Sequence, residues 1–448
     1  MGFSGVSLST SRRIVAIVIV ATAWQTSCQR APQALPPPGG LATHSALGDR
    51  TFVLPEPTLD RAAQLRFWTG FALFRDPWVR APASTTARDG LGPLFNARSC
   101  IACHAGGGRG TSLRFDANAA STVFRTARHG ALHTWGSQLQ PRATYDMTGQ
   151  AQRTRGFFAG EPSPTVEWQA EDDGLQAIRL HVAEYPDLSL SARIAPSLVG
   201  VGLLGEIADS AFIALADERD RDGDGISGRV HRLEDGAIGR FGWKAEHASV
   251  ARQTASAFAQ DMGITSELVP TESCTESQLH CLRQPSGKGP VGDVEINADL
   301  FAYVVEFTAA LPVPAARPVT ARVAAGRKLF YAAGCHDCHT PSHSIEQAGL
   351  VDTIWPYTDL LLHDMGGRLA DTVQAGNAAG SEWRTAPLWG LGAAMALNPK
   401  TGLLHDGRAR SVHEAILWHG GEAKQSNEIY QSFTNEQQQA LSAFVQAL

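Results

Sequence analysis

Two cysteine pairs in this sequence are each followed directly by a histidine, in residues 100–104 (CIACH) and 335–339 (CHDCH). The thiols of such a pair can add to the two vinyl groups of a haem, and the adjoining imidazole can bind the iron. We therefore predict two covalently bound haem c groups, attached through Cys100, Cys103, Cys335 and Cys338, with His104 and His339 as iron ligands. A shared zinc site and a redox dithiol are the alternatives, but neither requires the histidine, and the pairs lie far apart in the chain.

An acidic turn provides a second group of metal-binding side chains. Residues 220–225 (DRDGDG) place Asp220, Asp222 and Asp224 at alternate positions before a glycine that permits a sharp turn. Carboxylates in this order can converge on a hard cation, so we expect a calcium site here. The twelfth position is His231 and not a bidentate glutamate, which excludes a complete EF-hand. A solvated acidic turn without a bound ion is the alternative.

The amino terminus is typical of an export signal. Two arginines precede the apolar run 14–23, and small residues follow up to Cys28. The apolar run is too short to predict a membrane-spanning helix. We therefore expect a signal peptide over 1–28 and a periplasmic protein. Cys28 is the odd cysteine and suits a lipid anchor after cleavage, although Gln25 is atypical of that motif; an ordinary signal peptide cleaved nearby is the alternative.

Export implies an oxidising compartment, and two further cysteines agree with it. Cys274 and Cys281 lie in one polar, loop-like stretch of the sequence. We predict a local disulfide between them, because disulfides form and persist in exported proteins. Two free thiols are the alternative.

Helices must position the two C-x-x-C-H motifs. Thr58 is suited to cap a helix whose aromatic residues share one face, and this helix leads through a loop to the first motif. Thr320 can cap a second helix that runs directly into the second motif. An amphipathic helix is predicted from about Asn435 to the carboxyl end. A helix before C-x-x-C-H and a helix at the end are typical of a cytochrome c domain.

The prolines at 312–318 divide the chain into two halves. We expect a flexible tether over 29–57, an N-terminal haem domain over 58–315 and a C-terminal cytochrome c domain over 316–448. Residues 106–287 exceed what one small cytochrome needs, so the first domain should carry a large, loop-rich insertion of mixed structure. The predicted fold class is mainly α, with two cytochrome c-like haem domains.

Composition limits the partners of this protein. The chain has 448 residues, 43% of them hydrophobic and 18% charged, which describes an ordinary globular protein large enough for two or three domains. Its net charge is −6, and no basic stripe stands out. We therefore expect no binding to nucleic acid.

Several longer stretches of the sequence resemble a known family. They are GPLFNARSCIACH, ARIAPSLVGVGLLGEI, DRDGDGISGR, GRFGWKA, DMGITSE and LHDGRARSVHEAILWHGGEA, spread over most of residues 60–448. On these stretches the chain is similar to the dihaem oxidoreductase family within the superfamily of bacterial dihaem cytochrome c peroxidases. The resemblance implies a distal ligand for the second haem at His419, where the peroxidases usually have methionine. With His339 this ligand would give a bis-histidine haem.

The same resemblance makes the first haem, bound by His104, the expected reaction site. Peroxide cleavage needs an open iron face and an acid or amide nearby. Gln138, Gln140 and Glu206 are candidates for this role, and His133 is a candidate distal ligand that leaves on activation; structural hydrogen bonding is the alternative for each. Two tryptophans, Trp135 and Trp243, could lie between the haems, although core packing would also account for them.

The resemblance implies an enzyme, a dihaem c-type oxidoreductase with peroxidase-like activity. Electrons would come from a small cytochrome c or a cupredoxin, pass through the C-terminal haem and reach peroxide at the N-terminal haem. A dihaem carrier with two six-coordinate irons and no substrate is one alternative. Oxidation of a small organic substrate by oxygen or peroxide, as in the dihaem rubber oxygenases, is another.

Overall fold

The structure, a computed structural model, describes residues 1–2, 34–45, 52–85, 87–127, 135–146, 157–288, 293–347 and 349–448. Cys28 and nearly all of the predicted signal peptide lie outside the described residues, and so does His133. In the part of the chain that is described, no helix is both long enough and apolar enough to cross a bilayer.

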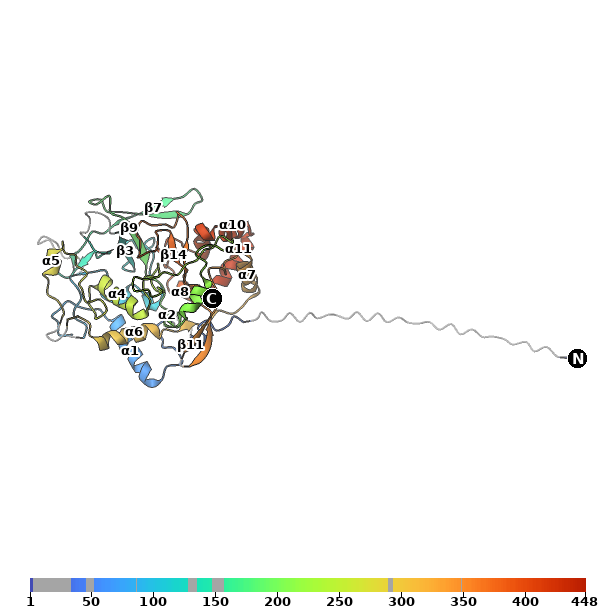
Figure 1. The fold of residues 1–448 in the computed structure, drawn as a ribbon, viewed down its shortest axis with the longest axis horizontal. Coiled ribbons are helices and arrows are strands. Elements are labelled where there is room, and N and C mark those ends of the chain that lie inside the picture. Colours follow the sequence, from blue (N-terminus) through green and yellow to red (C-terminus); the bar gives the residue numbers. More distant parts are fainter. Residues whose placement is uncertain are drawn as a thin grey trace.

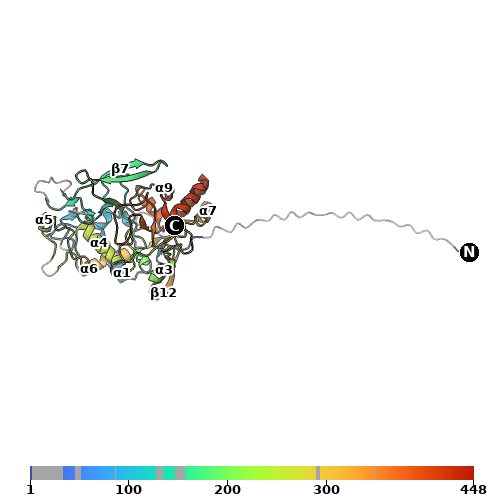
Figure 2. The ribbon, with the colours of Figure 1, turned by 45° about the horizontal axis from the view of Figure 1, so that its top comes forward.

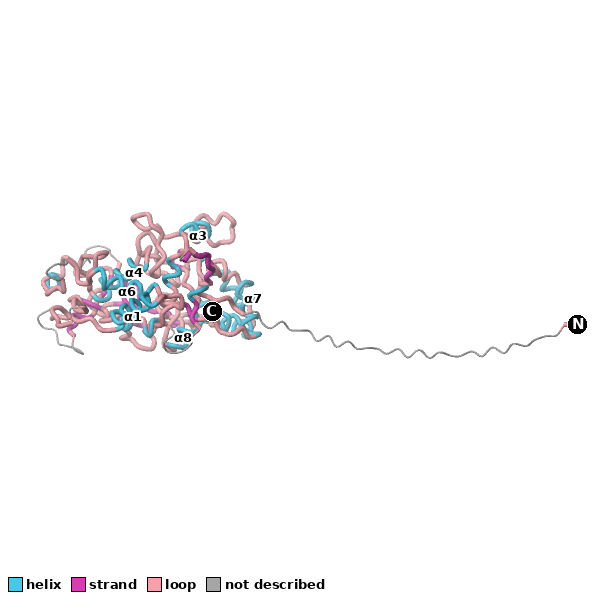
Figure 3. Tube along the Cα trace, turned by 90° about the horizontal axis from the view of Figure 1, so that it is seen from below, coloured by secondary structure: helices cyan, strands magenta, loops and turns pink. Residues whose placement is uncertain are grey.

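The fold is a mixture of helices and small sheets, so the prediction of a mainly α fold is wrong. Helices account for 29% of the chain and strands for 17%. Loops connect these elements through most of the body (Figure 3). Strands occur in the predicted insertion and also in the C-terminal part, where β11 (His343–Gln347) pairs with β12 (Leu350–Ile354) directly after the second C-x-x-C-H motif. In the described residues every strand is only two to six residues long, which leaves little periodicity to detect in the sequence.

Helix α1 (Arg61–Arg75) crosses α6 (Ala298–Ala309) ahead of the first motif, and α4 (Val250–Met262) packs beside them (Figure 1). The side chain of Asp60 caps α1 by accepting a hydrogen bond from the backbone of Ala63, so the predicted cap at Thr58 lies two residues too early. The helices approach closely at Gly70, where a Cβ would overlap the carbonyl oxygen of Tyr303.

The second motif follows a similar pair of helices. Helix α7 (Ala321–Ala332) is capped by the side chain of Thr320, as predicted, and crosses α11 (Asn435–Val445), the predicted C-terminal helix. Gly326 lies at this crossing, where a Cβ would overlap the carbonyl oxygen of Ala440. Each C-x-x-C-H motif is therefore preceded by a helix that crosses a later helix through a glycine.

The other helices are short. They are α2 (Val201–Gly205), α3 (Asp209–Leu215), α5 (Leu279–Leu282), α8 (Leu391–Leu397), α9 (Val412–Leu417) and α10 (Lys424–Ser432), with 3-10 turns η1 (Gly40–Ala42), η2 (Cys100–Ala102), η3 (Ala105–Gly107) and η4 (Gly421–Ala423). Of these, α10 contacts both α9 and η4. The turn η2 begins at Cys100 and is followed directly by Cys103, so it carries the first cysteine pair.

Within the described residues the strands form six small sheets. Their strands are β1 (Thr43–His44) with β10 (Val313–Pro314); β2 (Leu94–Phe95), β5 (Arg142–Ala143) and β6 (Phe158–Ala159); β4 (Gln138–Leu139), β3 (Thr122–Thr126) and β9 (Leu190–Ile194); β7 (Thr165–Ala170) with β8 (Gln176–His181); β11 with β12; and β13 (Leu362–Asp364) with β14 (Glu382–Arg384). The pair β1–β10 is parallel and the other pairs are antiparallel.

The hairpin of β7 and β8 lies along one edge of the body (Figure 2). Val166 and Trp168 alternate with polar residues on β7 and pair with Leu180 and Ile178 on β8, so one face of the hairpin is apolar. Gly174 has a φ of 80° in the connecting turn, a conformation that favours glycine.

The core around the second motif contains residues from both halves of the chain. Ile194 and Trp243, which precede the proline-rich segment, pack in one cluster with Phe330, Tyr357 and Trp418. The surroundings of the second motif therefore contain side chains from both halves of the chain.

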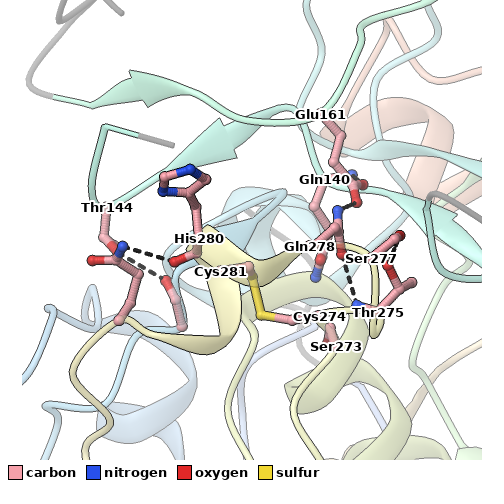
Figure 4. Close-up of a disulfide and its surroundings, with 12 residues drawn as sticks. Gln140, Thr144, Glu161, Ser273, Cys274, Thr275, Ser277, Gln278, His280 and Cys281 are labelled. Carbon is pink, nitrogen blue, oxygen red and sulfur yellow. Dashed lines mark hydrogen bonds between the residues drawn. A yellow bond between two sulfur atoms is a disulfide. The ribbon is translucent and has the colours of Figure 1, made fainter. Parts of the chain in front are cut away.

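The predicted disulfide between Cys274 and Cys281 is confirmed (Figure 4). It joins the start of a loop to α5 and lies beside Gln278, whose side-chain amide donates a hydrogen bond to Glu161. Glu161 also accepts a hydrogen bond of 2.6 Å from the backbone of Gln140. The loop that the disulfide closes is therefore joined to Gln140, next to β4, by hydrogen bonds through Gln278 and Glu161.

Candidate functional site

The first C-x-x-C-H motif forms a short turn with two free thiols. Cys100 begins η2, and Cys103 is buried at its end. Nδ1 of His104 lies 2.9 Å from the carbonyl oxygen of Pro196. Because a carbonyl can only accept, this nitrogen carries the proton, which leaves the lone pair on Nε2. Burial lowers the pKa of His104 to about 4, so the ring is neutral near pH 7 and can act as a metal ligand.

A cavity of about 260 Å³ adjoins this motif. Cys100, Cys103 and His104 line one part of it. The polar and charged side chains elsewhere on its wall include Arg125, Gln138, Arg193, Arg240, Glu246, His247, Gln253, Gln260 and Asp261. The cavity therefore combines a ring nitrogen able to bind a metal with groups able to give or take protons.

The predicted catalytic residues have different positions relative to this cavity. Gln138 lines it, and its Nε2 donates to Oδ1 of Asp261 at 2.7 Å and to Oδ1 of Asn96 at 2.9 Å. Gln140 is buried nearby, with its amide bonded to the carbonyl of Gln260, but does not line the cavity. Glu206 is exposed at the end of α2, and it too is absent from the lining.

Two carboxylates that the sequence analysis did not select face the first cavity. Burial raises the pKa of Asp261 to about 6, against the opposing effects of the Gln138 hydrogen bond and Arg125. Burial alone would also raise the pKa of Glu246, but Arg125, 3.3 Å away, and other cations lower it. Asp261 is the last residue but one of α4 and precedes buried Met262. The sequence therefore contained one signal for it, a carboxylate beside the apolar face of an amphipathic helix.

The second motif lines another cavity, of about 200 Å³, together with His419. Nδ1 of His339 donates to the carbonyl oxygen of Tyr357 at 2.9 Å, and Nδ1 of His419 donates to that of Ala415 at 2.7 Å. Both rings therefore keep a lone pair on Nε2. Burial lowers the pKa of His419 and lowers that of His339 to about 4. The charge of His419 also contributes to the lowered pKa of His339, so the two rings lie close together.

A buried ionic network supports the second motif. Nε2 of His363 lies 2.8 Å from Oδ2 of Asp359, and its Nδ1 lies 2.7 Å from Oε2 of Glu422. Burial alone would lower the pKa of His363, but the two carboxylates and Cys338, whose sulfur lies 3.7 Å from Nδ1, raise it well above its usual value. Both ring nitrogens are occupied, so this histidine positions its neighbours and has no free lone pair for a metal.

Two further residues with a side-chain sulfur or ring nitrogen, Met365 and His405, also line the second cavity. His405 stacks flat on Trp383, with ring centroids 3.6 Å apart and an angle of 5° between the planes. Burial lowers the pKa of His405 to about 3, so it is neutral at physiological pH.

The two cavities share a wall. Arg109, Trp243, Arg384, Ala386 and Pro387 line both of them. The indole of Trp243 is buried, and its Nε1 donates to the carbonyl of Ile194 at 2.9 Å. This position agrees with the expectation that Trp243 lies between the sites.

The other tryptophan proposed for that position, Trp135, packs elsewhere. Its neighbours are Leu139, Val182 and Leu188, and it lines neither cavity. Core packing therefore accounts for Trp135.

The acidic turn brings its three predicted ligands together. Asp220, Asp222 and Asp224 each offer a carboxylate oxygen within 4.8 Å of the others. Burial raises the pKa of Asp337, in the second C-x-x-C-H motif, against the opposing charge of His336, and the charges of Asp224 and Asp222 add to the rise, so the turn lies near that motif.

Both cavities have what a haem c group requires. Each presents two free thiols, a neutral imidazole with an available Nε2 and partly apolar walls. The shared wall also contains two guanidinium groups, Arg109 and Arg384, that have no carboxylate partner among the described residues. The donor set and the uncompensated cations fit an anionic haem in each cavity.

Comparisons with known proteins agree with this assignment of haem sites. The family model described as "Di-haem oxidoreductase, putative peroxidase" matches residues 38–132 and 130–448. No curated protein matches the sequence. Among solved structures, Kuenenia stuttgartiensis hydrazine synthase pressurized with 20 bar xenon is 12% identical to this chain. The match covers 98% of this chain and 100% of the hydrazine synthase chain, with a TM-score of 0.34. That score is too low to support an argument about the fold. Because the family model spans nearly all of the described residues, the chain belongs to the di-haem oxidoreductase family, whose members carry haem cofactors.

Proposed function

We propose that this protein is an exported dihaem c-type oxidoreductase that reduces peroxide at its N-terminal site with electrons received through its C-terminal site. Haem supplies one-electron transfer and, where the iron has an open coordination position, a site for peroxide. The protein would hold the groups through thioether bonds from Cys100 and Cys103 in one cavity and from Cys335 and Cys338 in the other. All four thiols are free, none being part of a disulfide, and this supports covalent attachment.

The observation that carries the proposal is the difference between the two cavities. In the second, His339 and His419 each offer an Nε2, which suits a six-coordinate, electron-transferring iron. In the first, the described lining contains His247 as well as His104, together with more charged side chains than line the second cavity. Proton-exchanging groups face the first cavity instead, among them Asp261.

Protons are the second requirement of the reaction, because reduction of peroxide to two waters consumes two protons and two electrons. Asp261 has a pKa of about 6, so both its protonated and ionised forms are populated near neutral pH. The amide of Gln138 holds Oδ1 of Asp261 and orients the carboxyl group. We assign Asp261 as the proton donor and Gln138 as its positioning residue. Glu206 has no place in this scheme, because it is exposed outside the cavity.

Three further parts of the proposal concern the surroundings of the enzyme. The signal-like residues 1–28 support export to the periplasm, and Cys28 supports a lipid anchor. A small cytochrome c or a cupredoxin is the expected electron donor, since both deliver single electrons. The converging carboxylates of Asp220, Asp222 and Asp224 support a bound calcium ion beside the second motif.

The proposal is tested by EPR spectra of the purified ferric protein, before and after half-reduction with a mild donor. A high-spin signal at either stage reveals an open iron and supports catalysis. Asp261→Asn should then slow peroxide turnover by about 10²–10⁴-fold while both haems remain bound. Two irons that stay low-spin at both stages would instead identify a carrier of electrons without a substrate.

A further inference from the structure

The wall between the two cavities contains two buried cations. Arg109 is 7% exposed, and Arg384 is partly buried beside it on the same wall, since both line the first and the second cavity. Burial lowers the pKa of each guanidinium to about 10, far above physiological pH, so both remain charged. Two positive charges are therefore held where the two haem sites meet.

The hydrogen bonds of these arginines go to backbone carbonyls. Nε and Nη2 of Arg109 donate to the carbonyl of Gly402, and Nη2 also donates to Leu404 at 3.1 Å. Nε of Arg384 donates to Gly242 at 2.8 Å, and its Nη1 donates to Thr385 at 3.1 Å. These bonds fix the orientation of each side chain. Within the described residues they leave Nη1 of Arg109 and Nη2 of Arg384 without an acceptor.

Other arginines on the first cavity are neutralised by carboxylates. Arg193 pairs with Asp371 at 2.7 Å, Arg125 pairs with Glu246 at 3.3 Å, and Arg240 pairs with Asp209. No such pair involves Arg109 or Arg384 in the described parts of the chain. The Trp243 ring, 5.6 Å from Arg109, and the charge of Asp359, which acts on Arg384 without an ion pair, compensate them only in part. Since a buried cation is costly unless an anion compensates it, these two guanidinium groups indicate anions supplied from outside the polypeptide.

We propose that Arg109 and Arg384 bind the propionate carboxylates of the two haems and form one anion-binding wall that serves both sites; this inference rests on the proposed dihaem function. Each haem carries two propionates, on the part of the porphyrin away from the vinyl groups that the thiols would take. Guanidinium groups bind carboxylates with short, charge-assisted hydrogen bonds. The wall therefore orients both cofactors and couples their charges, because each arginine faces both cavities.

The inference predicts the electrochemistry of the two haems. A positive charge beside a haem favours the ferrous state, which is less positive than the ferric state by one unit. Replacing Arg109 or Arg384 with methionine should lower the midpoint potentials of both haems. The matched control is Arg125→Met, because Arg125 lines only the first cavity and already pairs with Glu246. It should leave the potential of the second haem unchanged.

The experiment is a spectroelectrochemical titration of fully haem-loaded Arg109→Met and Arg384→Met, with haem content checked by the pyridine haemochrome assay. Resonance Raman spectra report the propionate bending bands of the same samples. Lower potentials for both haems, with shifted propionate bands, support the inference. Potentials and bands equal to those of the unmodified protein would overturn it.

Lysine variants keep the test decisive where methionine prevents folding or haem loading. Arg109→Lys and Arg384→Lys retain the charge and lose the planar guanidinium, so the potentials should stay near their original values while the propionate bands shift. Unchanged bands would overturn the inference. A finding that both irons are always low-spin would refute peroxide reduction but not the role of these arginines, because potentials and propionate bands can be measured in either spin state.

Discussion

Nε2 of His363 and Oδ2 of Asp359 lie 2.8 Å apart in the interior next to the second C-x-x-C-H motif. The side chains are 3% and 2% exposed, and Glu422 binds the other ring nitrogen, Nδ1. Glu422 also accepts hydrogen bonds from the backbone of Ser227 and Asp364. One cationic ring therefore joins β13, which carries His363, to η4, the turn that precedes α10 and carries Glu422.

His363→Leu should lower the free energy of unfolding by about 3–5 kcal/mol, because it leaves two buried carboxylates without a cation. Urea denaturation of the haem-loaded protein measures this change. Lys424→Met is the control, since Lys424 forms only an exposed pair with Glu428 and its loss should cost less than about 1 kcal/mol. Equal losses in the two variants would show that the network contributes no more than a surface ion pair.

Gly326→Ala should destabilise the protein by about 1–3 kcal/mol, because its Cβ would overlap the carbonyl of Ala440 where α7 crosses α11. Thermal unfolding followed by circular dichroism measures the effect. Gly367→Ala is the matched control, since a Cβ at Gly367 meets no atom within 4 Å. A normal melting temperature for Gly326→Ala would mean that the helices separate without cost.

Glu161 should make stability fall with increasing pH. Burial raises its pKa from 4.5 to about 7, so its share of stability is fully present below pH 4.5 and is lost as pH rises through 7. The loss amounts to about 3 kcal/mol. Glutamine at this position does not ionise. The stability of Glu161→Gln relative to the unmodified protein should therefore increase as pH rises from about 5 to about 8, an interval that brackets the folded pKa.

Chemical denaturation at several pH values measures this difference. The control is Glu167→Gln, which changes an exposed carboxylate on β7. A difference between Glu161→Gln and the unmodified protein that does not vary with pH would contradict the assignment.

His419→Gly should abolish the low-spin signal of the second haem while both haems stay attached, because the thioether bonds do not involve this ring. Absorption and EPR spectra of the ferric protein detect the change. His413→Gly is a control from α9, the helix that ends just before His419: His413 is exposed, hydrogen-bonds to the hydroxyl of Tyr430 and does not line the cavity. An unaltered spectrum in His419→Gly would rule out His419 as the distal ligand.

Removal of calcium with a chelator should lower the melting temperature, because Asp220, Asp222 and Asp224 would repel one another without the ion. Differential scanning calorimetry with and without chelator measures the shift. Asp222→Asn should melt lower than the unmodified protein and respond less to chelator. If chelator leaves the unmodified protein's melting temperature unchanged, the turn binds no calcium under those conditions.

Local features of this protein were predictable because neighbouring residues determine them. The cap at Thr320, the C-terminal helix from Asn435 and the disulfide between Cys274 and Cys281 all involve residues a few positions apart. His419 came from family resemblance, and the structure places it in the same cavity as His339.

Features that depend on tertiary packing were missed. The strands of the small sheets are short, and β3 pairs with β9, which is distant in the sequence. Hydrophobic periodicity in the sequence therefore did not indicate these strands. Asp261 and Arg109 look ordinary in the sequence and acquire their roles through burial beside segments far along the chain. Glu206 shows the converse case, since a plausible acid in a family motif lies exposed outside the cavity.

The crosslink of Cys274 to Cys281 has a consequence for maturation of the chain. The described residues contain this one oxidised pair and four free thiols, which under the proposed covalent attachment would have to stay reduced until they react with haem. The oxidised pair is separated by only seven positions, so its thiols meet often in the unfolded chain. The two cysteines within each C-x-x-C-H motif are closer still and would oxidise at least as readily. If the protein is exported and binds haem as proposed, its assembly would therefore need a reductant that reopens the motif pairs but spares the Cys274–Cys281 bond, in which Cys281 is buried.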